Sequence, residues 1–166
     1  SSKSGAFSML FVPMMCCFLQ FAAPERRAAG YVAAVFAGMY AAIILLVYFA
    51  KLTTVRFGGL TEQARILLDF RQMNFFFSFD LLGYALMSLA TFFAGLTVEP
   101  KDKPSKWLRA LLMIHGVFFI SCLIMPMLGV FQADSPAWIG VAVLEFWCAY
   151  FCSVAVLSRR YFQKIN

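Results

Sequence analysis

Five long apolar runs, separated by short polar connections, constrain the fold of this chain more than any other feature. They cover residues 5–23, 28–50, 73–98, 108–131 and 137–158. A helix needs about 20 apolar residues to cross a hydrocarbon layer about 30 Å thick. We therefore predict an all-α integral membrane protein, a single domain over residues 1–166 built as a bundle of five transmembrane helices.

The composition supports this class and excludes others. Hydrophobic residues make up 63% of the chain and charged residues 13%, whereas a soluble domain is nearer half and a quarter. A chain of 166 residues cannot hide so much apolar surface in one core. An aqueous enzyme, a disordered segment and a nucleic-acid-binding domain are all poor interpretations, and the lipid bilayer is the expected partner.

The connections between the runs are polar. Residues 99–104 hold two prolines and four charges, which disfavour a helix there, and 132–136 form a short polar turn. The longest connection, 51–72, contains apolar and charged residues at helical spacing between about 61 and 72. This pattern predicts an amphipathic helix lying in the membrane interface between the second and third spans. A lid or gate over a site is the functional alternative.

The distribution of basic residues predicts the orientation. The chain has 14 Lys and Arg against 8 Asp and Glu, and these basic residues lie mainly between the apolar runs. Counted on alternate sides of five spans, five lie on the side of the N-terminus and nine on the other side. The positive-inside tendency places the C-terminus in the cytoplasm and the N-terminus outside. The first run also resembles a signal-peptide core, but we interpret it as a span because the chain retains it.

Three ionisable side chains lie within the apolar runs: Asp80, His115 and Glu145. Such groups are costly at membrane depth, so each is a candidate functional residue. Helical rise places Asp80 and Glu145 at similar depth in the outer half, and His115 in the inner half. The two carboxylates would share a proton or hold a cation if their faces converge, with Tyr84 donating to Asp80 and His115 continuing a proton route. The alternative is that each group only fixes helix packing.

The sequence offers no metal or cofactor site and no catalytic residue. One histidine cannot supply bis-histidine ligation, and the five cysteines include no C-x-x-C pair. We expect the cysteines to be small buried apolar side chains. Hydrolase, metalloprotease and phosphate-loop motifs are absent from the sequence. Enzymatic activity is therefore disfavoured.

The second run carries a series of small residues at every fourth position: Gly30, Ala34, Gly38 and Ala42. Alanines at 29, 33, 37 and 41 run beside them. Small residues let two helix backbones approach closely, so this face predicts tight packing against another helix, of this chain, of a second copy or of a partner. In the fourth run, Pro126 predicts a kink.

Three segments, residues 79–84, 115–120 and 125–129, resemble small multipass bacterial membrane proteins of unknown function. The resemblance covers mainly the last three runs and implies a location in the bacterial inner membrane. It implies no activity and no functional residue.

These observations lead to two functional hypotheses. The first is a non-catalytic membrane protein that acts through helix–helix association, as an accessory subunit or partner of a membrane complex. The second is a small carrier or receptor for a solute or ion, with Asp80 and Glu145 as its binding carboxylates. The two differ in whether those carboxylates share a cavity.

Overall fold

The computed structural model describes residues 2–57, 59–68, 75–128 and 137–165, with side chains described from 9 and from 145 in the first and last of these ranges. Within them the chain is helical apart from turns and connections, and no strand occurs. The all-α class is thus confirmed. The helices are α1 (Ser2–Gln20), α2 (Arg27–Ala50), α3 (Glu62–Leu68), α4 (Phe75–Thr97), α5 (Lys103–His115), α6 (Phe118–Met127) and α7 (Ala137–Ile165).

Three helical stretches of the described chain are long and apolar enough to cross a membrane: Pro24–Val55, Phe75–Thr97 and Lys103–Met127. The first joins a 3₁₀ turn (Pro24–Arg26), α2 and a π-helical turn (Lys51–Val55), and the third joins α5 and α6. They correspond to the second, third and fourth predicted spans. Spanning by α1 and α7 stays a prediction.

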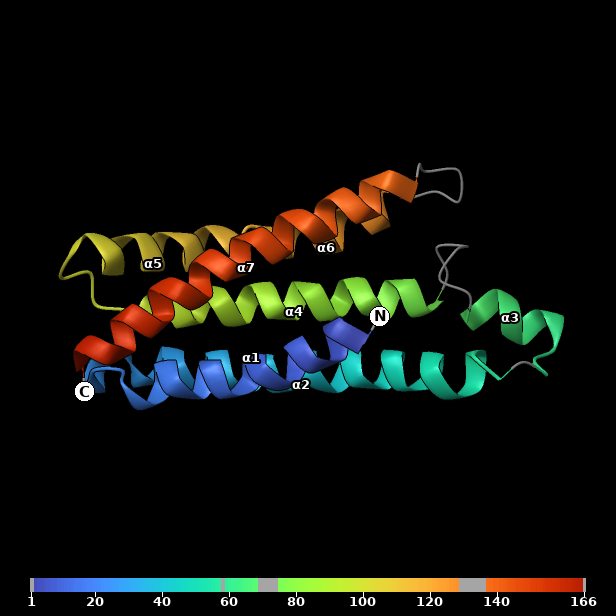
Figure 1. Ribbon diagram of the computed structural model, residues 1–166, viewed down its shortest axis with the longest axis horizontal. Coiled ribbons are helices and arrows are strands. Elements are labelled where there is room, and N and C mark those ends of the chain that lie inside the picture. The colour runs from blue at the N-terminus through green and yellow to red at the C-terminus, as the bar shows by residue number, and fades with distance from the viewer. Residues whose placement is uncertain (1, 58, 69–74, 129–136, 166) are drawn as a thin grey trace.

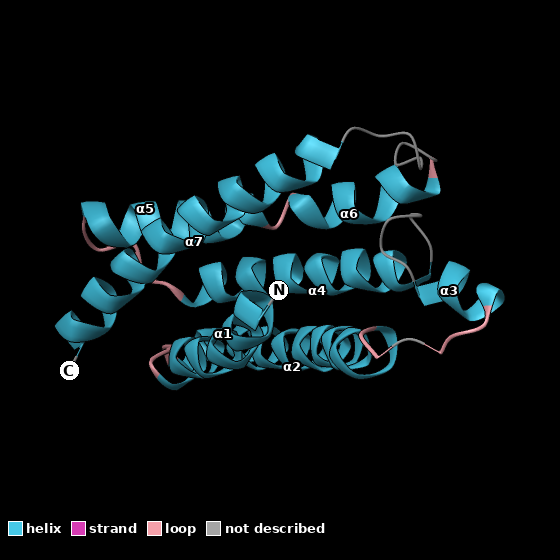
Figure 2. Cartoon of the chain, turned by 45° about the vertical axis from the view of Figure 1, so that its right-hand side comes forward, coloured by secondary structure: helices cyan, strands magenta, loops and turns pink. Residues whose placement is uncertain are grey.

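Helix α4 lies in the middle of the bundle. It packs most extensively against α2, and it also contacts α5, α6 and α1. In both ribbon views α4 runs between the α1–α2 pair and the α5–α6 pair, and α7 crosses obliquely over α5 and α6 (Figures 1 and 2). The bundle is therefore layered, with one helix covered on both sides.

Small side chains permit the close contact of α2 and α4. Ala33 and Ala37 on α2, and Ala90 and Ala94 on α4, are completely buried. Gly83 of α4 is also in close contact with α2, because a Cβ added there would lie 2.9 Å from Cδ1 of Ile44 and that side chain would have to shift. Backbones that approach so closely gain dispersion contacts along the whole interface, which is the main attraction between helices in lipid.

Helix α5 begins at Lys103, five residues before the predicted start of the fourth span. The expectation that residues 99–104 are non-helical is therefore wrong for residues 103 and 104. The Asp102 side chain accepts a hydrogen bond from the Ser105 backbone N–H, and the Ser105 hydroxyl accepts one from the Asp102 N–H, which is a reciprocal capping box. Pro104 is tolerated because the first helical turn leaves backbone N–H groups unpaired in any case.

The fourth span is interrupted at Gly116, between α5 and α6, where the sequence predicted no break, and the kink expected at Pro126 stays a prediction. The Gly116 and Val117 N–H groups bond to carbonyls three residues earlier, at 3.0 Å each, which tightens the helix locally. A Cβ at Gly116 would lie 2.7 Å from Cβ of Phe92, so α4 forces a glycine here. Pro126 lies in the last turn of α6, one residue before that helix ends.

Other boundaries also differ from the prediction. Helix α7 continues beyond residue 158 to Ile165. Within the described residues, α3 forms the first part of the predicted interfacial helix, with Ile66 and Leu67 exposed. Residues 69–72 of that helix, 73–74 of the third run and 129–131 of the fourth lie outside the described residues. All five cysteines are free thiols. Four of them are exposed and the fifth is half-buried, so their predicted burial is wrong: Cys16, Cys17, Cys148, Cys152 and Cys122.

Candidate functional site

One face of α4 carries a line of polar side chains through the bundle. Asp80, Tyr84, Ser88 and Thr91 follow each other at intervals of four, four and three residues, which keeps them on one side of a helix with 3.6 residues per turn. The sequence predicts Asp80 as an ionisable residue within an apolar run, and Tyr84 from its position one turn after Asp80. Ser88 and Thr91, both completely buried, continue the same spacing and were not recognised as members of the line.

At one end of this line, the Asp80 carboxyl is half-buried and its Oδ1 atom has no hydrogen-bond partner among the described residues. Its electrostatic neighbours include Lys51, just beyond the end of α2, and the hydroxyls of Tyr40 and Tyr84. Tyr84 also shares a hydrogen bond with Tyr48. A carboxyl near a cation and several hydroxyls is therefore held where α2 meets the start of α4.

At the other end, His115 is 1% exposed and its Nδ1 atom lies 2.8 Å from the Thr91 hydroxyl. That hydroxyl donates its only hydrogen to the Ser88 carbonyl at 2.8 Å, so it must accept from His115. The proton of the neutral imidazole therefore lies on Nδ1, and Nε2 is an acceptor. Nε2 is buried and has no partner in the described part of the chain.

Trp147 of α7 connects the two ends. Its ring centroid lies 4.5 Å from that of Tyr84 and 5.5 Å from that of His115. The Nε1 atom is buried and, within the described ranges, has no hydrogen-bond partner. A donor on Trp147 and an acceptor on His115 thus lie on neighbouring rings. We call Asp80, Tyr84, Ser88, Thr91, His115 and Trp147 the polar column.

Glu145 does not belong to the polar column. It is exposed on α7, two residues before the buried Trp147. Residues two apart lie on opposite sides of a helix, so when Trp147 points inward Glu145 points outward. The predicted convergence of Asp80 and Glu145 is therefore absent. His115 lies beside Thr91. Thr91 comes 11 residues after Asp80 in α4, so the two are separated by about 16 Å along the helix axis.

The predicted packing face of α2 divides into a covered and an uncovered part. Gly30 is buried, and a Cβ there would lie 2.9 Å from the Leu19 Cα. Ala34 is half-buried, whereas Gly38 and Ala42 are exposed, with nothing within 4 Å of a Cβ placed on Gly38. The adjacent series, residues 33, 37 and 41, is buried in their place. Helix packing within the chain thus uses the neighbouring alanines.

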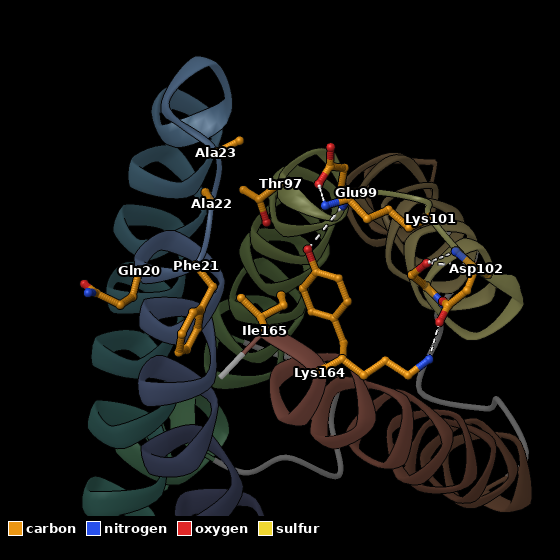
Figure 3. Close-up of a pocket in the computed structure, with 12 residues that line it drawn as sticks. Gln20, Phe21, Ala22, Ala23, Thr97, Glu99, Lys101, Asp102, Lys164 and Ile165 are labelled. Atoms are coloured by element: carbon orange, nitrogen blue, oxygen red, sulfur yellow. Dashed lines mark hydrogen bonds and ion pairs between the residues drawn. The ribbon is translucent and has the colours of Figure 1, made fainter.

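A pocket of about 460 Å³ opens at the end of the bundle where α1, α4 and α7 end and α5 begins, and Figure 3 shows its lining. We call it the end pocket. Its charged groups form two ion pairs, Glu99 with Lys101 at 2.7 Å and Asp102 with Lys164. The sequence does not predict this pocket, because its walls come from three separate segments, residues 20–23, 97–105 and 161–165.

Within the described ranges no three His, Cys, Asp or Glu side chains gather as metal ligands would. Comparison with known proteins found no family model that matches the chain, and no curated protein or solved structure similar to it. The function must therefore be argued from the geometry alone.

Proposed function

We propose that this chain is a non-catalytic multipass membrane protein that acts through helix–helix association, as an accessory subunit or partner of a membrane complex. In this proposal α1 and α7 also cross the bilayer, giving five spans. The location is the bacterial inner membrane, as the resemblance noted above implies. The proposal depends mainly on the uncovered part of the small-residue face of α2.

Gly38 and Ala42 support the proposal because they lie one turn apart and are exposed, with the large side chains of Val35, Met39 and Leu46 exposed around them. Small residues between larger ones form a shallow depression into which a second helix can pack. In the most apolar part of this span only 33% of residues are buried, against 56% in α4. Much of the surface of α2 is therefore left uncovered by the described chain.

The test compares two leucine substitutions on α2. Gly38→Leu fills the uncovered depression, whereas Ala37→Leu enlarges a side chain that is completely buried in the bundle. Native mass spectrometry of the detergent-extracted protein should show a complex larger than 18.7 kDa that Gly38→Leu dissociates without loss of helicity. Ala37→Leu should lower stability itself. A complex of native size in Gly38→Leu, or a monomer in the wild type, would contradict the proposal.

The polar column favours a second candidate function, a small carrier or receptor for a solute or ion. Three buried polar atoms without partners in the described chain support it: Oδ1 of Asp80, Nε2 of His115 and Nε1 of Trp147. Each is costly in hydrocarbon unless water, a proton or a solute satisfies it. Glu145 no longer belongs to this candidate, because it is exposed.

Uptake into proteoliposomes tests the second candidate. Asp80→Asn should abolish pH-dependent uptake or ligand binding, because it removes the only carboxyl of the polar column. Glu145→Gln is the matched control, since it neutralises an exposed carboxylate on α7 and should leave uptake unchanged. Equal uptake by the wild type and Asp80→Asn would eliminate this function.

The orientation stays part of the proposal. Arg26 donates to the Val98 carbonyl at 3.0 Å, and Lys101 and Lys164 line the end pocket, so basic residues from distant segments gather at one end of the bundle. The positive-inside tendency makes this end cytoplasmic. A reporter that fluoresces only in the cytoplasm should therefore fluoresce when it is fused to the C-terminus of this chain. A dark C-terminal fusion would indicate the opposite orientation.

A further inference from the structure

The end pocket lies at the level where the bundle leaves the hydrocarbon. All three stretches that are long enough to span a membrane meet this end: the first begins at Pro24, the second ends at Thr97 and the third begins at Lys103. The pocket lining includes Ala23, Thr97 and Asp102, which are at or next to those boundaries. Its depth is therefore that of lipid headgroups and the first part of their chains.

The charged lining of the pocket is balanced. Lys101 and Lys164 provide two ammonium groups, and Glu99 and Asp102 provide two carboxylates (Figure 3). The side chains of these ion pairs are between 37% and 77% exposed. Ion pairs so accessible to water contribute little to stability, so a ligand with charges of both signs can replace them at small cost.

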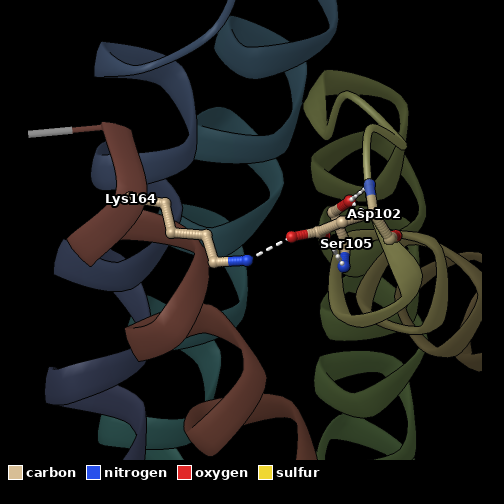
Figure 4. A network of polar contacts seen from close by, with 3 residues as sticks. All are labelled: Asp102, Ser105 and Lys164. Carbon is tan, nitrogen blue, oxygen red and sulfur yellow. Dashed lines mark hydrogen bonds and ion pairs between the residues drawn. The ribbon is translucent and has the colours of Figure 1, made fainter.

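Asp102 is held in position independently of Lys164. Its Oδ1 atom accepts the Ser105 N–H at 2.9 Å, while Oδ2 pairs with Lys164 (Figure 4). The carboxylate is thus fixed at the start of α5 whether or not Lys164 contacts it. A preorganised acceptor of this kind binds a ligand cation without a further loss of side-chain freedom.

The rest of the lining is suited to the less polar part of the same ligand. Phe21, Ala22 and Ala23, after the end of α1, and Ile165 of α7 provide apolar surface. Tyr161 also lines the pocket, and its hydroxyl accepts the Glu99 N–H at 3.2 Å. A hydroxyl that accepts one hydrogen bond can still donate its own hydrogen.

We propose that the end pocket binds the headgroup of a phospholipid that carries both a phosphate and a primary ammonium, as phosphatidylethanolamine does. Lys101 and Lys164 contact the phosphate, and Glu99 and Asp102 accept hydrogen bonds from the ammonium. The apolar wall contacts the glycerol and the first methylene groups. This inference is independent of the functions proposed above.

The balanced charge selects among headgroups. A purely anionic headgroup would pair with the lysines and leave Glu99 and Asp102 without cations. A choline headgroup carries both charges, but its quaternary ammonium has no N–H to donate to a carboxylate. The ethanolamine headgroup satisfies both pairs, so the lining favours it over the other two.

The experiment measures lipid retention by the full-length protein, delipidated in detergent and supplied with phosphatidylethanolamine, phosphatidylcholine or phosphatidylglycerol. Native mass spectrometry should show tighter retention of phosphatidylethanolamine than of the other two. Lys164→Gln and Asp102→Asn should each lower its affinity about fivefold or more, the effect of losing one charge-assisted hydrogen bond. Asn caps a helix as well as Asp does, so Asp102→Asn keeps the start of α5.

Matched controls change the same charges outside the pocket. Lys106→Gln and Glu25→Gln alter exposed residues that do not line the pocket, and they should leave lipid retention unchanged. Equal retention of the three lipids by the wild type would overturn the proposal without reference to any variant. An equal loss in Lys106→Gln and Lys164→Gln would overturn it too, because a general surface charge would then explain binding.

A last arm separates the lipid from a soluble ligand of the same chemistry. Glycerophosphoethanolamine carries the same headgroup without acyl chains. It should displace the lipid only at concentrations far above that of the lipid. Displacement at equal concentration would show that the pocket takes a soluble phosphoethanolamine compound and would overturn the assignment to a membrane lipid.

Discussion

The polar column and the end pocket satisfy their polar groups in opposite ways. In the column, atoms of Asp80, His115 and Trp147 are buried without partners in the described chain. In the pocket, each carboxylate pairs with a lysine, and Asp102 also accepts a hydrogen bond from Ser105. The groups that lie near water are thus paired, and those in the interior are the ones left incomplete.

This difference teaches where each region is sensitive. A buried polar atom that loses its partner costs the full desolvation energy, whereas an exposed ion pair exchanges with water at little cost. Substitutions in the polar column should therefore change stability. Substitutions in the end pocket should change binding and titration and leave the fold largely unaffected.

The largest expected effect comes from His115. His115→Ala should lower the free energy of unfolding by about 3 kcal/mol, because it leaves a cavity among buried rings and removes the hydrogen bond to Thr91. Thr91→Val keeps the volume and should cost about half as much. Reversible unfolding in mixed detergent micelles measures both. If His115→Ala costs no more than Lys164→Gln, the contrast between column and pocket fails.

A pair of glycines extends the comparison to apolar packing. Gly30→Ala should destabilise the protein by about 2 kcal/mol, because the new methyl group would lie 2.9 Å from the Leu19 backbone. Gly38→Ala meets nothing within 4 Å and should be neutral or slightly stabilising, since alanine favours helix over glycine. The same unfolding assay ranks the two. Equal destabilisation would mean that α1 does not pack on Gly30 as described.

A smaller and more local effect is expected at the start of α5. Asp102→Ala removes the side-chain acceptor of the Ser105 N–H, whereas Asp102→Asn retains one. Hydrogen exchange should therefore be faster in the first turn of α5 in the alanine variant alone. Fast exchange in both variants would indicate that the ion pair with Lys164, and not the capping box, holds this turn.

The smallest effect is in the titration of the end pocket. The Lys164 ammonium, together with hydrogen bonds from Ser105, holds the pKa of the Asp102 carboxyl well below its ordinary value of 3.8. Lys101 likewise lowers the pKa of the Glu99 carboxyl, and that carboxylate raises the pKa of the Lys101 ammonium. The pKa of each carboxyl is lower in the folded state than in the unfolded state. Each carboxylate therefore contributes fully to stability when the pH is above its unfolded-state pKa. This contribution is lost as the pH falls through the folded pKa.

A carboxyl-carbon NMR titration checks this assignment. In Lys164→Gln the pKa of Asp102 should rise toward its ordinary value, while the pKa of Glu99 stays unchanged because its partner is Lys101. An Asp102 pKa unaffected by Lys164→Gln would show that the hydrogen bonds from Ser105 alone account for the lowering.

Part of the candidate site follows from local spacing. Asp80 and Tyr84 are one turn apart, so any α4 helix places them on one face, and Asp80 and His115 stand out because charge is costly in hydrocarbon. Glu145 was predicted to join them on depth alone. Depth gives the position of a residue along the helix axis but does not say which face of the helix its side chain occupies. Trp147 occupies the buried face of α7, so Glu145 lies on the exposed face.

The sequence by itself determined the helical class and the three spans that length and hydropathy support, because lipid permits few other arrangements for long apolar runs. Only the tertiary structure decided which residues of α2 meet α4, why Gly116 interrupts the fourth span, and that the ends of distant helices enclose a pocket. Those properties depend on how each helix is rotated about its axis. That rotation is set by contacts with neighbours and has no signature in one run alone.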